Sequence, residues 1–156
     1  MSAGPTRLEA AARSGTPAVI APGCLDMVNF WQPESLPEKY RDRRIYHHNP
    51  KQTLIRTTPD DNTELGRLIA SKLNLSVGPV AVYFPLRGIS VLSSPGNPYH
   101  WPEADAALLA SLRQHLRPDI PVHEFDCTIN DPQFADAMAN GLLAMIPSAA
   151  RRARAE

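Results

Sequence analysis

The sequence predicts an α/β fold of three layers, in which a mostly parallel sheet is covered by helices on both faces. Short apolar runs bounded by Pro and Gly, "PAVIAPG" at 17–23 and "GPVAVYFPL" at 78–86, are typical of strands buried on both faces. Segments with the apolar spacing of amphipathic helices follow such runs. This alternation of strand and helix is the pattern of a parallel sheet with crossover helices.

The first elements predicted are a helix at 5–15 and a strand at 17–21. Pro5 suits the first turn of a helix, and Gly15 suits its C-cap. A helix that leads into a buried strand is half of a βαβ unit. We therefore expect the sheet to lack the first strands of the complete domain.

The segment 24–44 has no sustained period of 2 or 3.6 and is interrupted by Pro33 and Pro37. Connections of this length are usually binding loops or interface segments. The next stretches, "RIYHHN" and "QTLIRTT", are expected to be short extended segments, the second alternatively the start of a helix.

The clearest helix spans 59–74, with Thr58 as N-cap, Pro59 in the first turn, and acidic residues near the positive end of the helix dipole. Its inward face is predicted to carry Leu65, Leu68, Ile69 and Leu73. A buried strand at 79–84, a helix at 103–116, a strand in "IPVHEFD" and a last helix from about Asn130 or Asp131 follow.

Composition narrows the function classes. The 156 residues fit one domain, placed at 2–146, and we expect a basic, flexible and solvated tail at 147–156. The formal net charge is zero, so no global field favours nucleic acid or anionic membranes. No apolar run approaches the roughly 20 residues of a membrane span, and no secretion signal is evident. We expect a cytoplasmic protein.

Three loops at expected strand ends carry the polar residues that could bind a ligand. In the first, Cys24 is either a nucleophile or a small buried thiol, and Asp26 is an acid catalyst or a turn residue, with Asn29 beside them. Two cysteines, Cys24 and Cys127, are too few for a disulfide framework.

In the second loop, Arg56, Thr57 and Thr58 precede a helix N-terminus, a combination that suits a small anion. The alternative is a plain capped helix. His47 and His48 are candidates for a general base or acid, but adjacent residues of a strand point to opposite faces, so a shared metal ion is not expected.

In the third loop, Arg87 and Gly88 follow a buried strand. They either contact a ligand, since Gly88 permits close backbone approach, or Arg87 pairs with Asp105 or Asp126. His100 lies in an aromatic stretch suited to a pocket, and Asp126 is expected at the same sheet edge.

The motifs "GCLDMVNFW", "HNPKQTLIRTT" and "PLRGISVLSSPGNPYHWPEADAAL" resemble the C-terminal domain of the Tm-one-like ATP-binding proteins, which join a plant inhibitor of viral replication to bacterial proteins of unknown activity. The similarity runs from Ser2 to Leu143. It implies an α/β domain that adjoins a separate ATP-binding N-terminal domain, so no cofactor is expected in this chain. Positions inside the motifs, Asn49 among them, become candidate ligand contacts.

Two hypotheses follow. The first is a ligand-binding and assembly domain that packs against its own copy or against an ATP-binding N-terminal partner domain. The second is an enzyme of hydrolase or lyase type acting on a small carboxylate or phosphate compound. Arg56 and Arg87 would hold the anion, His47 or His48 would transfer protons, and Asp26 or Asp126 would orient the histidine.

Overall fold

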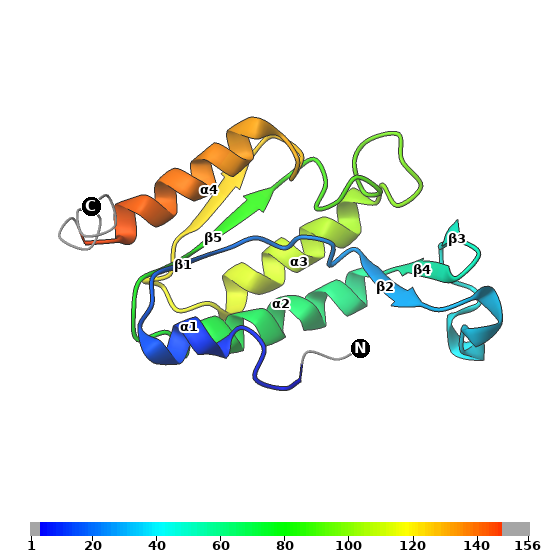
Figure 1. Ribbon diagram of the computed structural model, residues 1–156, viewed down its shortest axis with the longest axis horizontal. Coiled ribbons are helices and arrows are strands. Elements are labelled where there is room, and N and C mark those ends of the chain that lie inside the picture. Colours follow the sequence, from blue (N-terminus) through cyan, green and yellow to red (C-terminus); the bar gives the residue numbers. More distant parts are fainter. Residues whose placement is uncertain (1–3, 148–156) are drawn as a thin grey trace.

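The computed structural model describes residues 4–147 and contains a parallel sheet of three strands (Figure 1). The strand order is β1-β5-β6, and both neighbouring pairs are parallel. The strands are β1 (Ala18–Ile20), β5 (Val80–Pro85) and β6 (Val122–Phe125). The prediction of an α/β fold with a parallel sheet is confirmed.

Four helices accompany this sheet in the described part of the chain, together with two short 3-10 turns. The helices are α1 (Glu9–Ser14), α2 (Pro59–Leu73), α3 (Pro102–His115) and α4 (Pro132–Met145). The 3-10 turns are η1 (Pro33–Ser35) and η2 (Glu38–Tyr40). The helices predicted near 59–74, 103–116 and after Asp131 are therefore present.

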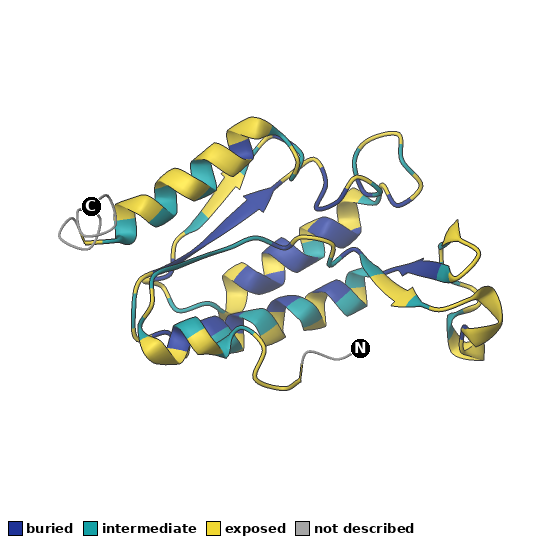
Figure 2. Ribbon diagram, viewed as in Figure 1, coloured by how far each residue is buried: buried dark blue, intermediate teal, exposed yellow. Residues whose placement is uncertain are grey.

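The central strand β5 packs against helices on both faces of the sheet, because its side chains point alternately to the two faces. Val80, Val82 and Phe84 pack with α2 and α3 in one core cluster. Ala81 and Tyr83 pack on the other face, in a cluster that includes Phe134 of α4. Figure 2 shows β5 buried along its length, between helices on both sides. The three-layer arrangement is confirmed.

A second, antiparallel sheet extends from one end of the molecule (Figure 1). Its order is β2-β4-β3, formed by β2 (Met27–Phe30), β4 (Gln52–Arg56) and β3 (Ile45–Asn49). The extended segments expected around "RIYHHN" and "QTLIRTT" are β3 and β4. Strand β2 was missed, since its four residues show no apolar alternation and it is defined by pairing with β4.

Helix α1 is shorter than predicted. It starts at Glu9 rather than in the turn after Pro5, because Leu8 adopts a left-handed conformation, φ 70°, which a continuous helix does not accommodate. Its end agrees with the prediction: Gly15 is the C-cap at φ 72°.

Helix α2 begins as predicted, and its predicted inward face is confirmed in part. Leu73 is buried, and Leu65 and Ile69 pack against the core, whereas Leu68 is 40% exposed. The buried residues of the helix also include Asn62, Gly66 and Ala70. The reason is the closeness of α3: a Cβ added at Gly66 would lie 2.6 Å from Cβ of Ser111. Small residues therefore occupy the helix contact, and the predicted leucine stripe lies partly outside it.

Residues 4–147 include no helix long and apolar enough to cross a membrane. Apart from Pro147, the predicted basic tail lies outside the described residues.

Candidate functional site

A polar-edged hollow lies between the carboxyl edge of the parallel sheet and the antiparallel sheet. We call it the intersheet cleft; its volume is about 570 Å³. The loops after β1, β5 and β6 form one wall, and the three antiparallel strands form the other. The lining residues are Cys24, Met27, Asn29, Tyr46, His48, Gln52, Leu54, Ile89, Ser90, Val91, Leu92, Ile129 and Asn130. Ligands of open α/β sheets bind at this edge.

Asp26 lies behind the cleft and is fully buried. The hydroxyl of Ser90, a lining residue, donates a hydrogen bond to Oδ2 of Asp26 at 2.5 Å. The other carboxylate oxygen, Oδ1, is buried without a hydrogen-bond partner among the described residues. Buried polar groups of proteins are generally hydrogen-bonded, and Oδ1 has room for a further donor.

Cys24 is exposed and holds a left-handed conformation, φ 57°. Its backbone N–H donates to the carbonyl of Ile89 at 2.9 Å, which ties the loops after β1 and β5 together. Burial of the thiol, and then the charge of Asp26, raise the pKa of Cys24. A nucleophilic thiolate needs the opposite shift, so the geometry does not favour the nucleophile. The expectation of a buried thiol at this position was also wrong.

Amide side chains form a hydrogen-bonded row across the antiparallel wall. Nδ2 of Asn49 donates to Oε1 of Gln52 at 3.4 Å, and Nε2 of Gln52 donates to Oδ1 of Asn29 at 3.0 Å. Asn29 and Gln52 line the cleft, while Asn49 lies outside it. The row fixes the orientation of the two lining amides.

Arg56, the centre of the expected anion site, is 1% exposed. Its Nη2 donates to Oδ1 of Asp105 at 2.6 Å, and its Nε donates to the carbonyl of Tyr99 at 2.9 Å. Its Nη1 donates to Oγ1 of Thr57 at 3.0 Å. Arg56 also lines a hollow of about 370 Å³, but Asp60, Asp61 and Glu64 line the same hollow and oppose an anion there. Burial raises the pKa of Asp105, although Arg56 opposes that effect.

The hydroxyl groups of the two threonines that follow Arg56 bond to backbone groups of the chain. Oγ1 of Thr57 donates to the carbonyl of Leu25 at 3.0 Å. Oγ1 of Thr58 accepts from the backbone N–H of Asp61 at 3.2 Å, and the Asp61 carboxylate accepts from the Thr58 N–H at 2.9 Å. This capping box starts α2 and matches the alternative of a plain capped helix.

Arg87 pairs with Asp126, one of the two partners considered from the sequence. Its Nε and Nη2 donate to the two carboxylate oxygens at 2.6 and 2.8 Å, and the side chains are 58% and 70% exposed. The ion pair lowers the pKa of Asp126. Gly88, at φ 133°, is needed because a Cβ there would lie 2.8 Å from N of Ser94. The group that lies close to the Gly88 backbone is thus the following loop of the same chain, at Ser94.

The structure brings together only part of the predicted set. Asn29 and His48 line the cleft and Asp26 lies behind it, whereas His47 and Arg87 are absent from its lining. His100 is also outside; its Nδ1 is 3.2 Å from the carbonyl of Ser93. Arg56 and Arg87 do not line a common cavity, so the expected two-arginine grip is not formed in this structure.

Sequence reasoning missed two lining residues with polar side chains, Gln52 and Ser90. Gln52 and Ser90 lie inside the motifs that carried the family resemblance, and that was the one signal for them. Within residues 4–147, no three His, Cys, Asp or Glu side chains gather closely enough to hold a metal ion.

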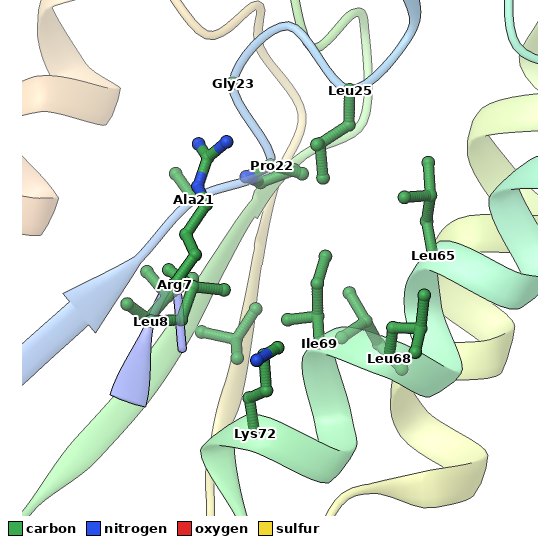
Figure 3. Close-up of a pocket in the computed structure, with 13 residues that line it drawn as sticks. Arg7, Leu8, Ala21, Pro22, Gly23, Leu25, Leu65, Leu68, Ile69 and Lys72 are labelled. Carbon is green, nitrogen blue, oxygen red and sulfur yellow. The ribbon is translucent and has the colours of Figure 1, made fainter. Parts of the chain in front are cut away.

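A second hollow, which we call the β1 groove, lies between α2 and the segment around β1 (Figure 3). Its volume is about 210 Å³ and its lining is mainly apolar. Leu65, Leu68 and Ile69 of α2 face Pro22 and Leu25 across it. Arg7 and Lys72 lie at its margin, and Lys72 pairs with Glu9 at 2.8 Å.

Comparison with known proteins gives a consistent family. A model described as the C-terminal domain of an uncharacterised protein family (UPF0261) matches residues 1–146. A UPF0261 protein of Clostridium tetani is 42% identical over 147 residues, covering 94% of this chain and 36% of that protein. A UPF0261 protein of Rhizobium meliloti is 46% identical over 138 residues, covering 84% of this chain and 33% of that protein.

A plant protein also matches. The ToMV resistance protein Tm-1(GCR237) of Solanum lycopersicum is 33% identical over 154 residues, covering 94% of this chain and 20% of that protein. The resemblance to the Tm-one-like proteins is thereby confirmed. The chain spans about a third of the length of the bacterial relatives.

Proposed function

We propose, from the premise that this chain belongs to the C-terminal domain family of UPF0261, that the domain binds a small molecule in the intersheet cleft. The observation that carries the proposal is the buried Asp26–Ser90 pair placed against a cleft of about 570 Å³ at the carboxyl edge of the parallel sheet. Small-molecule sites are typically hollows of about 300–1,000 Å³, mostly apolar, with a few fixed polar groups.

The composition of the cleft agrees with this proposal. Aliphatic side chains such as Ile89, Leu92 and Ile129 supply apolar surface, and the Asn29–Gln52 amides supply oriented polar groups. ATP binding stays an expectation for the family's N-terminal domain and is not proposed for this chain.

A fragment survey followed by ¹⁵N–¹H NMR tests the proposal. We expect cleft ligands to shift the amide signals of 89–92 and 129–130, and to lose this effect in Val91→Trp, because Val91 is a 61% exposed lining residue whose enlargement fills the cleft. Bound ligand should stabilise the fold by about 2.7 kcal/mol at 100 times its dissociation constant.

Val77→Trp is the matched control, since Val77 is 77% exposed and lies outside the cleft. This variant should bind as the wild type does. Fragment shifts confined to other surfaces, or shifts that survive Val91→Trp unchanged, would contradict the proposal.

Assembly is the second candidate function, and the β1 groove favours it. Strand β1 is at an edge of the parallel sheet, where its outer backbone groups are open to another strand. The adjoining groove is apolar and includes Leu68, which is 40% exposed. A second copy that pairs its own β1 with this edge would cover both features in one symmetric interface.

Size-exclusion chromatography with light scattering tests the assembly. We expect a dimer for the wild type and a monomer for Leu68→Lys, because a charge in the groove opposes burial. Leu143→Lys is the control, since Leu143 is 48% exposed on α4, outside the groove. A wild-type monomer, or equal dissociation of both variants, would count against this interface.

A further inference from the structure

We infer that the intersheet cleft selects a planar ligand that donates an N–H to Ser90 and carries no negative charge, such as an aromatic amide or a heterocyclic lactam. The inference deepens the proposed binding function and rests on it. It departs from the small anion expected from the sequence. Three properties of the cleft support it.

The first property is the fixed polarity of Ser90. A serine hydroxyl has one proton to donate and can accept two hydrogen bonds. The proton is donated to Oδ2 of Asp26 at 2.5 Å. One acceptor position is used weakly by the N–H of Ser93 at 3.3 Å. The hydroxyl oxygen of Ser90 can therefore still accept one hydrogen bond, and an N–H group of a ligand can donate it.

The second property is the charge around the cleft. The described residues that line it include no Asp, Glu, Lys or Arg, and His48 is the one titratable base among them, so no permanently charged cation there compensates an anionic ligand. Asp26 lies directly behind Ser90, and its charge raises the pKa of Cys24 in the cleft wall, after the larger effect of burial. The same field opposes a carboxylate or phosphate.

Behind Ser90, the second oxygen of Asp26 strengthens the acceptor character. Oδ1 is buried without a partner among the described residues, whereas Arg56 is held by Asp105 at 2.6 Å. The carboxylate of Asp26 is therefore not paired with a cation through its side-chain oxygens. A hydrogen-bond donor at Ser90 would reduce the electrostatic cost of this arrangement.

The third property is the shape of the apolar contacts. Ile89, Leu92 and Ile129 come from the loops of the parallel sheet, and Leu54 comes from the opposite antiparallel wall. Apolar walls on two sides suit a flat ring system. The lining amides Asn29 and Asn130 can bond to the polar edge of such a ring.

Three probes of one shape separate these properties: 2-naphthamide, 2-naphthoate and N,N-dimethyl-2-naphthamide. Each is titrated into the wild-type chain while the amide signals of 89–92 and 129–130 are followed by NMR. We expect 2-naphthamide to bind, and both the anion and the dimethyl amide, which lacks N–H, to bind about tenfold more weakly.

Ser90→Ala tests the acceptor directly. This variant should lose the preference for 2-naphthamide over its dimethyl analogue. Ser71→Ala, an exposed position of α2 outside the cleft lining, should keep it. If Ser90→Ala does not fold, the comparison of the three probes on the wild type still decides.

The outcomes separate this inference from the proposed function. Equal or tighter binding of 2-naphthoate at the same amide signals overturns the inference and leaves the cleft a binding site. Equal binding of the dimethyl amide does the same. If the fragment survey finds cleft ligands but 2-naphthamide is not one of them, the inference is overturned alone. If nothing binds the cleft, both fail.

Discussion

Arg56 and Arg87 have similar partners in very different surroundings. Each donates to an aspartate at 2.6 Å, but the side chain of Arg56 is 0% exposed and that of Arg87 is 58% exposed. A buried charge that loses its partner is left uncompensated, whereas an exposed one is solvated by water. We therefore expect Arg56 to contribute much to the stability of the fold and Arg87 to contribute little.

Replacing the two arginines should show this contrast. We expect Arg56→Ala to lower the free energy of unfolding by about 3–5 kcal/mol, because Asp105 stays buried without its partner. Arg87→Ala, the control, should change it by less than about 1 kcal/mol. Urea denaturation followed by circular dichroism measures both. A small effect of Arg56→Ala would mean that its network is not a stabilising one.

Burial of Arg56 could not be read from its neighbours in the sequence. The residue ends a polar-looking stretch, and its partner Asp105 lies in α3, beyond another strand and helix. Local pattern predicts that Arg56 is near a helix start. Only the tertiary arrangement determines whether that arginine faces solvent or the interior.

The start of α2 combines the capping box with an ion pair. Nη1 of Arg43 donates to Oδ2 of Asp61 at 2.5 Å, in addition to the bonds with Thr58. Burial alone would raise the pKa of Asp61, but the hydrogen bonds from Arg43 and Thr58 outweigh it and lower the pKa below its ordinary 3.8.

This lowered pKa gives a signed prediction for pH. An acid whose folded pKa is depressed adds stability that is present above its unfolded pKa and is lost as pH falls through the folded pKa. The wild type should therefore lose stability below about pH 4 partly through Asp61. Asp61→Asn removes that part, so its unfolding free energy should fall less steeply with acid.

The measurement is urea unfolding at several pH values between 6 and 2.5, for the wild type, Asp61→Asn and Arg43→Gln. Arg43→Gln removes one cause of the lowered pKa and should flatten the acid dependence in the same direction. Parallel curves for the wild type and Asp61→Asn would show that this helix start has no part in acid unfolding.

Elements differ in how well their own sequence predicts them. Helix α2 carries its start signal locally in Thr58 and Pro59, so its bounds were predicted closely. Its buried face was predicted only in part, because Gly66 packs against Ser111 of α3, and that contact depends on a helix much later in the chain. Strand β2 has no independent signal and exists through its pairing with β4.

At the scale of the molecule, the parallel sheet and its helices were predictable because burial on both faces leaves apolar runs. The antiparallel sheet and the cleft could not be predicted, since one wall of the cleft includes β2, which had no sequence signal. Of the candidate site, Asn29, His48 and Asp26 were found as polar residues at strand ends. Ser90, which joins Asp26 to the cleft, was missed because a serine in a serine-rich loop has no distinguishing pattern.

The antiparallel sheet leaves and rejoins the parallel part of the fold at nearly one point. The backbone N–H of Thr57 donates to the carbonyl of Asp26 at 3.0 Å, so the segment between them begins and ends at a single hydrogen bond. Away from Arg43 and Arg56, which bond to α2 and α3, such a closed segment can change in length or composition without moving the strands and helices outside it. Exchanging it between family members would replace one wall of the cleft while keeping the other, a simple route by which one scaffold acquires different ligands.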